Sequence, residues 1–158
     1  MKPRIGFVVL ALLLLLGSPA RSQETTRTIG LSASIQTFQS VILVPIWISD
    51  RFIIAPGVGV DWTQNVDTDL VFALVPKFYT SMGRIAPYVS LLGGGMLNLP
   101  TGGGRVLDLI FGLAFGGDYF VNPKFSFGVE ARVDAFVPDT GNINVSTGAA
   151  ANVSIYLK

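Results

Sequence analysis

The charged side chains that fall inside the apolar segments of this chain are spaced so that they can meet on one face of a strand. In an extended strand, residues two apart point to the same side, and Glu130, Arg132 and Asp134 follow that spacing. The candidate ionic residues are Asp61, Lys77, Asp108, Glu130, Arg132 and Asp134. We expect Lys77, Arg132 and Glu130 to form a buried, hydrogen-bonded network with Asp61, Asp108 or Asp134, because buried charges are stable only when they are paired. Alternatively, the same charges line a narrow pore and control the passage of ions.

Other kinds of chemistry find little support in the composition. The chain contains no His and no Cys, which removes the commonest general base, the commonest metal ligand and any disulfide. The glycine run at 102–104 is followed by no Lys-Ser or Lys-Thr pair, so we do not interpret it as a phosphate-binding loop. The formal net charge of +1 gives no reason to expect a nucleic-acid partner. We therefore expect a non-enzymatic protein without metal or cofactor.

The first 22 residues have the organisation of a secretory signal peptide. Lys2 and Arg4 precede an apolar run over 5–16, and small residues follow that run. A membrane-spanning helix needs about 20 residues, so we expect cleavage, after Ala20 or after Ser22, rather than a permanent anchor. The predicted organisation is a signal peptide over 1–22 and one domain over 23–158.

The remaining sequence alternates apolar and polar residues with a period of two, interrupted by short runs rich in Gly, Pro, Asn, Asp and Ser. This pattern predicts strands joined by turns. Eight strands are predicted, over approximately 27–37, 41–48, 52–63, 69–80, 85–97, 105–119, 125–137 and 143–157. Because the connections between successive strands are short, we expect an all-β, up-and-down antiparallel barrel.

Two arrangements of such a barrel fit the alternation. A soluble barrel turns its apolar face inward, whereas an outer-membrane barrel turns it outward. Only 13% of the chain is charged, whereas a soluble domain has about 25%. The strand charges, Asp69 and Asp118 among them, lie on the polar phase, and a basic residue facing lipid at the midplane costs about 2–4 kcal/mol. The sequence therefore favours the transmembrane arrangement, although segments 41–48 and 85–97 carry no charge to show which way they face.

Aromatic residues collect near the predicted strand ends. With the N-terminus on the periplasmic side, all of them except Trp62 fall near periplasmic ends, where rings at headgroup depth form girdles. Packing in an ordinary core is the alternative explanation. The predicted membrane-interface aromatics are Trp47, Phe52, Trp62, Phe78, Tyr119 and Phe125.

Two stretches carry a resemblance to a known family. Residues 116–132 (GGDYFVNPKFSFGVEAR) and residues 85–89 (IAPYV), with the glycines at 93–95, are similar to the eight-stranded outer-membrane β-barrel family, as found in the membrane domain of outer-membrane protein A. The resemblance covers 27–158 and implies a barrel placed in the membrane by the outer-membrane insertion machinery. It says little about function, because such barrels serve as anchors, channels, adhesins and enzymes. Enzymes on this scaffold use a His, which this chain lacks.

The sequence thus predicts a bacterial outer-membrane barrel, expected to be a monomer surrounded by outer-membrane lipid. Its predicted role is structural, supporting membrane integrity, or that of a narrow porin-like channel. The alternative is a soluble periplasmic ligand-binding barrel of the lipocalin type.

Overall fold

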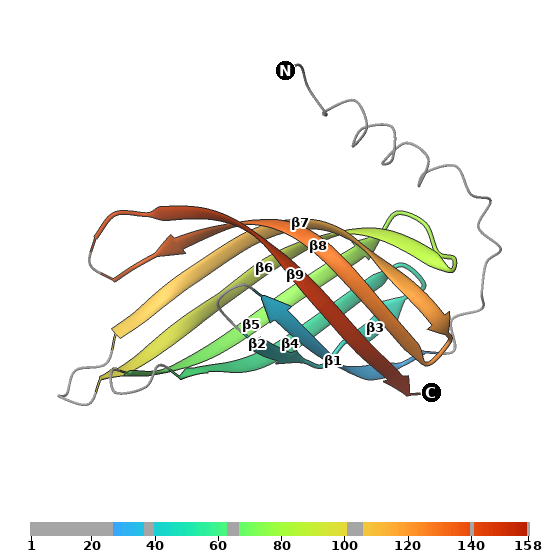
Figure 1. The fold of residues 1–158 in the computed structure, drawn as a ribbon, viewed down its shortest axis with the longest axis horizontal. Coiled ribbons are helices and arrows are strands. Elements are labelled where there is room, and N and C mark those ends of the chain that lie inside the picture. The colour runs from blue at the N-terminus through green and yellow to red at the C-terminus, as the bar shows by residue number, and fades with distance from the viewer. Residues whose placement is uncertain (1–26, 37–39, 63–66, 101–105, 140, 158) are drawn as a thin grey trace, which may run out of the picture.

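The segments with a period of two form antiparallel strands that pair with their neighbours in chain order (Figure 1). The structure, a computed structural model, describes residues 27–36, 40–62, 67–100, 106–139 and 141–157, so the predicted signal peptide over 1–22 lies outside the described residues. The strands are β1 (Ile29–Gln36), β2 (Ser40–Leu43), β3 (Ile46–Ser49), β4 (Phe52–Trp62), β5 (Asp67–Tyr79), β6 (Ile85–Pro100), β7 (Val106–Asn122), β8 (Phe125–Val137) and β9 (Asn144–Leu157). Within these ranges, no helix is long and apolar enough to cross a lipid bilayer.

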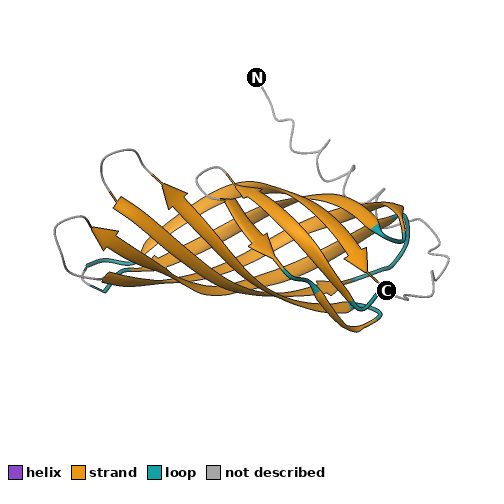
Figure 2. Ribbon diagram, turned by 90° about the horizontal axis from the view of Figure 1, so that it is seen from below, coloured by secondary structure: helices purple, strands orange, loops and turns teal. Residues whose placement is uncertain are grey.

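The sheet closes on itself because the first strand pairs with the last. β1 and β9 run antiparallel from Ile29 opposite Leu157 to Gln36 opposite Ala150. Strands β2 and β3 both lie between β1 and β4 and together occupy one position in the barrel wall. We call each such position a stave, so the nine strands form a closed barrel of eight staves (Figure 2). The prediction of an all-β, up-and-down antiparallel barrel is confirmed.

The stave formed by β2 and β3 is interrupted at Val44 and Pro45. Proline has no backbone N–H and cannot donate to a sheet ladder, which ends the regular strand at Leu43. Pairing nevertheless continues across the break, because Pro45 O accepts a hydrogen bond from Gly30 N at 2.8 Å and Val44 N donates to Pro56 O at 2.8 Å. The predicted strand over 41–48 is therefore one stave built from two short strands.

The apolar side chains of the barrel point outward. On β8, Phe127, Val129 and Val133 are exposed, whereas Ser126 and Arg132 are buried. The outward, exposed phenylalanines also include Phe72, Phe78, Phe111 and Phe115. A soluble lipocalin-type barrel would carry these side chains inside, so the facing of the strands opposes that alternative.

The connections at the end of the barrel that holds the C-terminus are tight turns (Figure 1). In the turn between β7 and β8, Lys124 N donates to Asn122 Oδ1 at 2.8 Å. This side-chain acceptor is characteristic of an Asx turn, which reverses the chain within a few residues. The turn brings Ser126 of β8 opposite Phe120 of β7, so that interior side chains of the two strands lie side by side.

Candidate functional site

The polar interior of the barrel contains a cluster of ion pairs on β8. Arg132 donates from Nε to Asp134 Oδ2 at 2.7 Å and from Nη2 to Asp134 Oδ1 at 2.9 Å. Its Nη1 atom also lies 3.8 Å from Glu130 Oε1. All three side chains are largely buried, and the strand period of two places them on the same face. The positive charge of Arg132 thus lies beside two negative charges, those of Glu130 and Asp134.

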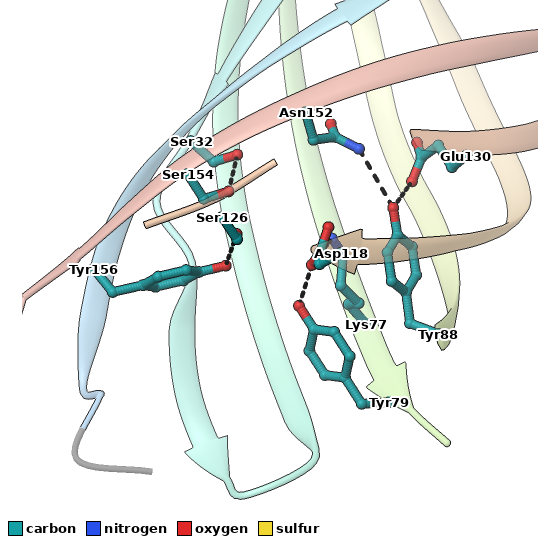
Figure 3. Close-up of polar contacts among 10 residues, drawn as sticks. All are labelled: Ser32, Lys77, Tyr79, Tyr88, Asp118, Ser126, Glu130, Asn152, Ser154 and Tyr156. Atoms are coloured by element: carbon teal, nitrogen blue, oxygen red, sulfur yellow. Dashed lines mark hydrogen bonds and ion pairs between the residues drawn. The ribbon is translucent and has the colours of Figure 1, made fainter. Parts of the chain in front are cut away.

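A second ion pair joins β5 to β7. Lys77 Nζ lies 3.3 Å from Asp118 Oδ2, and the hydroxyl of Tyr79 donates a hydrogen bond to the same carboxylate oxygen. Lys77 Nζ also lies 3.8 Å from the ring centroid of Tyr88, which is within the range of a cation–π contact. The Asp118 carboxylate therefore accepts hydrogen bonds from both Lys77 and Tyr79 (Figure 3).

Tyr88 on β6 connects the two charged groups. Its hydroxyl donates to Glu130 Oε2 at 2.8 Å and accepts from Asn152 Nδ2 at 3.3 Å (Figure 3). Through this side chain, the Lys77 pair and the Arg132 cluster belong to one network that crosses the lumen. Buried polar networks of this kind rigidify a core when every member is satisfied.

Two glycines, which have no side chain, leave room for the side chains of this network. A Cβ atom added at Gly116 would lie 2.8 Å from the Tyr88 ring and 2.8 Å from Glu130 Cβ. A Cβ atom added at Gly128 would collide with the Asp118 carboxylate. The glycines of the 116–132 stretch therefore permit close approach of the interior side chains.

Beside the network, toward the end of the barrel that holds the C-terminus, aromatic rings fill the lumen. Trp47 stacks on Tyr79 with ring centroids 5.5 Å apart and meets Tyr156 edge-on at 5.8 Å. Tyr79 also contacts Phe120 and Tyr88. We call these five rings (Trp47, Tyr79, Tyr88, Phe120 and Tyr156) the aromatic cluster; all of them are buried. The cluster occupies the lumen where a pore would have to pass.

Arg27 closes the aromatic cluster from the N-terminal side of β1. Its Nε donates to Pro123 O at 2.7 Å, and its guanidinium lies 3.9 Å from the ring centroid of Phe120 and 5.4 Å from those of Trp47 and Tyr156. Burial lowers the pKa of Arg27 from its ordinary value, and the charges of nearby groups, Asp118 among them, oppose that shift. Arginine stays charged in proteins, so a cation covers the rings.

Serine hydroxyls complete the polar wall on β1, β8 and β9. Ser154 Oγ donates to Ser32 Oγ at 2.8 Å, and Ser126 Oγ donates to Tyr156 OH at 3.3 Å (Figure 3). These small side chains are buried on the inside of the barrel. They also satisfy each other's hydrogen-bonding groups away from bulk water.

The placement of Trp47 corrects one prediction. The sequence suggests a membrane-interface position, but the side chain lies inside the barrel and is only 8% exposed. The reason is the phase of the stave: Val41, Pro45 and Trp47 share the inward phase, and no charge in 41–48 indicates that phase. A large ring at this position fills the lumen instead of facing lipid.

The other predicted interface aromatics have varied surroundings. Phe78 faces outward and is exposed, whereas Phe52 and Phe125 are partly exposed. Tyr119 is partly exposed; its ring is tilted against that of Phe127, with centroids 5.1 Å apart, and the Arg84 guanidinium lies 5.2 Å from its centroid. Trp62 belongs to β4, but its side chain lies outside what the structure describes.

The predicted ionic residues are not all brought together. Arg132, Glu130 and Asp134 meet, but Lys77 pairs with Asp118, which is not among the predicted ionic residues. Asp108 accepts a hydrogen bond from the backbone N–H of Asp139 at 3.2 Å. The side chain of Asp61 falls outside the described part of β4.

The interior residues that sequence reasoning missed are Arg27 and the rings of the aromatic cluster. Asp118 was on the polar phase, but alternation alone gives no reason to choose it over another aspartate. The cross-strand register supplies that choice, and it depends on turn lengths that the sequence leaves uncertain by a residue or two. Arg27 stands at the edge of the predicted first strand, where no pattern marks a lumen-facing side chain.

A cavity in the lumen borders the aromatic cluster at Tyr156, and its volume is about 80 Å³. Its lining includes the ionic residues Lys77, Glu130, Arg132 and Asp134. Across the described ranges, no group of three or more metal-ligating side chains comes together. The site is thus a polar lumen with internal ion pairs and a small open volume.

Comparison with known proteins places the fold in one class. The barrel is similar to the N-terminal β-barrel domain of Pseudomonas aeruginosa OprF, with a TM-score of 0.56 and 15% identity over 82% of this chain and 95% of that chain. It is also similar to Neisserial surface protein A, with a TM-score of 0.56 and 14% identity over 82% of this chain and 93% of that chain. No family model and no curated protein sequence matches the chain.

At these identities the likeness concerns the fold alone. The chain is a closed, eight-stranded antiparallel barrel of the kind found in outer-membrane proteins. The resemblance expected from residues 116–132 is confirmed at the level of architecture. Its role is a separate question, because one barrel architecture hosts many functions.

Proposed function

We propose that this protein is a bacterial outer-membrane barrel that spans the lipid bilayer, has a structural role and is closed to solutes at rest. The observation that carries this proposal is the distribution of side chains across the barrel wall. Large apolar residues are exposed on the outside of the barrel, and the ion pairs of Lys77 and Arg132 are inside it. Exposed apolar surface of this extent is unstable in water, and hydrocarbon is the solvent that suits it.

Strand lengths support the same placement. A transmembrane strand needs about 9–11 residues at a tilt, and β8 has 13 residues while β9 has 14. Phe78 and the Arg84–Tyr119 pair lie at the end that holds the C-terminus, where headgroups would contact aromatic rings and basic side chains. This end would face the periplasm, because outer-membrane barrels have their short turns there.

The closed state is supported by the aromatic cluster and Arg27. Five buried rings and a guanidinium occupy the lumen at the periplasmic end. An eight-stranded barrel has an interior only wide enough for its own side chains. A structural barrel that seals the membrane therefore fits the interior better than an open pore.

A narrow channel is the second candidate, and one observation favours it. The cavity is lined by charged residues from β5 and β8, as in pores whose charges select ions. Conduction would require the aromatic cluster to move aside. Measurement of conductance separates the two roles.

The remaining parts of the proposal concern biogenesis and partners. Residues 1–22 act as the secretory signal, and the outer-membrane insertion machinery assembles the mature chain as a monomer in lipid. The protein is non-enzymatic, because the interior ionic groups contact one another and the chain has no His to activate a nucleophile.

Membrane fractionation, followed by conductance measurement, tests the proposal. The mature protein is expected in the outer-membrane fraction, to require detergent for extraction, and to change its gel mobility on heating. In planar bilayers it should show no steady conductance. Recovery as a detergent-free soluble monomer would reject the membrane placement, whereas steady ion conductance would reject the closed state and favour the channel.

A further inference from the structure

The end of the barrel that holds the C-terminus carries exposed positive charge on its short turns (Figure 1). Each of three turns contributes one exposed basic residue: Arg51 between β3 and β4, Arg84 between β5 and β6, and Lys124 between β7 and β8. Within these three turns, Asp50 is the one acidic residue. We call Arg51, Arg84 and Lys124 the basic rim.

The positive charge of the basic rim is not neutralised by the part of the chain that the structure describes. In the lumen, Lys77 is paired with Asp118, and Arg132 is paired with Asp134 and Glu130. No ion pair joins a residue of the basic rim to a described carboxylate. The cations of the basic rim can therefore bind an anion that comes from outside the chain.

The three residues of the basic rim occupy equivalent positions in successive turns. In each case the carbonyl oxygen accepts a backbone hydrogen bond from a member of the aromatic cluster near the end of the adjacent strand. These bonds join Arg51 to Tyr79 at 2.8 Å, Arg84 to Phe120 at 2.8 Å and Lys124 to Tyr156 at 2.7 Å. The backbone of each turn is thus fixed to the closed part of the barrel, while the cationic side chain stays exposed.

Each residue of the basic rim directly precedes an apolar residue that begins the next strand. These residues are Phe52 of β4, Ile85 of β6 and Phe125 of β8. Ile85 is 49% exposed, and Phe52 and Phe125 lie opposite the exposed residues Phe78 and Ile155 on the outward face. A cation that is followed by an outward apolar side chain fits an amphiphile with a negative headgroup and a hydrocarbon chain.

The Arg84 side chain shows where such a headgroup would lie. Its guanidinium is 5.2 Å from the ring centroid of Tyr119, which is partly exposed and lies opposite Ile85 on the outward face. A cation–π contact uses the face of the ring and leaves the N–H donors of the guanidinium available. Because these donors match the geometry of a phosphate group, Arg84 can bind a phosphate at the outer wall.

The opposite end of the barrel has the reverse charge. Asp139 is exposed there, and Asp69 and Asp108 are partly exposed. The structure describes no basic residue in the strand ends and loops on that side. A negatively charged lipid surface is therefore attracted to the basic rim and repelled by the other end.

We propose that the basic rim binds the headgroups of anionic phospholipids in the leaflet that surrounds the short turns. This inference rests on the proposed membrane placement, which brings headgroups to that end of the barrel. The phosphate lies against the exposed cations, and the acyl chains lie along the outward residues that begin β4, β6 and β8. Each basic residue near an anionic membrane surface raises the affinity about fivefold, so the basic rim selects lipids of net negative charge over zwitterionic ones.

Electron spin resonance of spin-labelled lipids tests the proposal. The mature protein is reconstituted in phosphatidylcholine vesicles that contain a trace of chain-labelled phosphatidylglycerol or chain-labelled phosphatidylcholine. The fraction of each label that is immobilised at the protein gives a relative association constant. Phosphatidylglycerol should be preferred about threefold or more at low salt. The preference should fall in 1 M NaCl, where the Debye length is only about 3 Å.

A triple variant and a matched control locate the preference. Combining Arg51→Gln, Arg84→Gln and Lys124→Gln should abolish it, whereas Asp139→Asn, which removes an exposed charge from the opposite end, should leave it unchanged. If the triple variant does not fold, judged by heat-modifiable mobility, Arg84→Gln alone should lower the preference. Equal association of the two lipids with the unmodified protein, or an undiminished preference in the variants of the basic rim, would overturn the proposal. Absence of any immobilised lipid would instead overturn the membrane placement.

Discussion

Arg132 and Asp134 lie two residues apart on β8 and are joined by two hydrogen bonds, at 2.7 Å and 2.9 Å. A guanidinium and a carboxylate that meet in this bidentate way form one of the stronger polar contacts in proteins. Both side chains are buried in the lumen. Because neither group can turn to water, the stability of the barrel should depend on the pair staying intact.

Replacing Arg132 with Ala should lower the free energy of unfolding by about 3–5 kcal/mol, because Asp134 and Glu130 would be left as buried charges without a partner. Urea unfolding in detergent micelles measures this change. Arg51→Ala is the matched control, since Arg51 is exposed on the turn between β3 and β4, and it should leave the unfolding midpoint in place. A midpoint for Arg132→Ala equal to that of the unmodified protein would argue against the network.

The Lys77–Asp118 pair should be energetically coupled. In a double-mutant cycle of Lys77→Met and Asp118→Asn, the double variant should be less destabilised than the sum of the single variants, with a coupling of about 1 kcal/mol or more. The control cycle combines Lys77→Met with Asp108→Asn, because Asp108 contacts the backbone of Asp139 instead. Strict additivity in the first cycle would contradict the contact at 3.3 Å.

The two adjacent glycines of β7 should respond differently to substitution. Gly116→Ala should destabilise the barrel by about 1–3 kcal/mol, because its Cβ would overlap the backbone carbonyl oxygen of Val129, as well as Tyr88 and Glu130. Gly117→Ala should be tolerated, since the nearest atom to its Cβ is Ala86 O at 3.9 Å. Thermal unfolding of both variants, followed by gel mobility, compares them directly. Equal midpoints would show that the lumen accommodates the extra methyl group.

Opening the aromatic cluster should create conductance. Trp47→Ala removes the ring that stacks on Tyr79 and should convert a closed barrel into one with measurable single-channel events in planar bilayers. Phe78→Ala is the control, because this aromatic residue on β5 is exposed on the outside. Identical silent recordings from both variants would show that the lumen is blocked by something other than the cluster.

The number and order of the staves were predictable from the sequence because period-two alternation and short turns leave few other architectures. The facing of β8 was predictable for a related reason: Glu130, Arg132 and Asp134 can lie only on the side away from hydrocarbon. Where no charge is present, as in 41–48, the sequence gives no phase, and Trp47 was placed on the wrong face.

The pairing of Lys77 with Asp118 was not predictable, since it depends on register between β5 and β7 across β6. The ends of the β1–β2 hairpin, in contrast, were predictable to within one residue: β1 ends at Gln36 and β2 begins at Ser40, against expected bounds of 37 and 41. Sequence patterns thus set the faces of this barrel, while the pairings in its lumen are set by register.

The most direct test of the central claim asks which solvent contacts the outward side chains. The chain has no Cys, so Phe115→Cys and Val129→Cys each introduce a single site for a nitroxide spin label on the outward face, and Lys124→Cys introduces one on a turn. In reconstituted vesicles, the labels at 115 and 129 should collide more often with oxygen than with a water-soluble nickel chelate, and the label at 124 should show the reverse. Free collision of the nickel chelate with the labels at 115 and 129 would contradict the account.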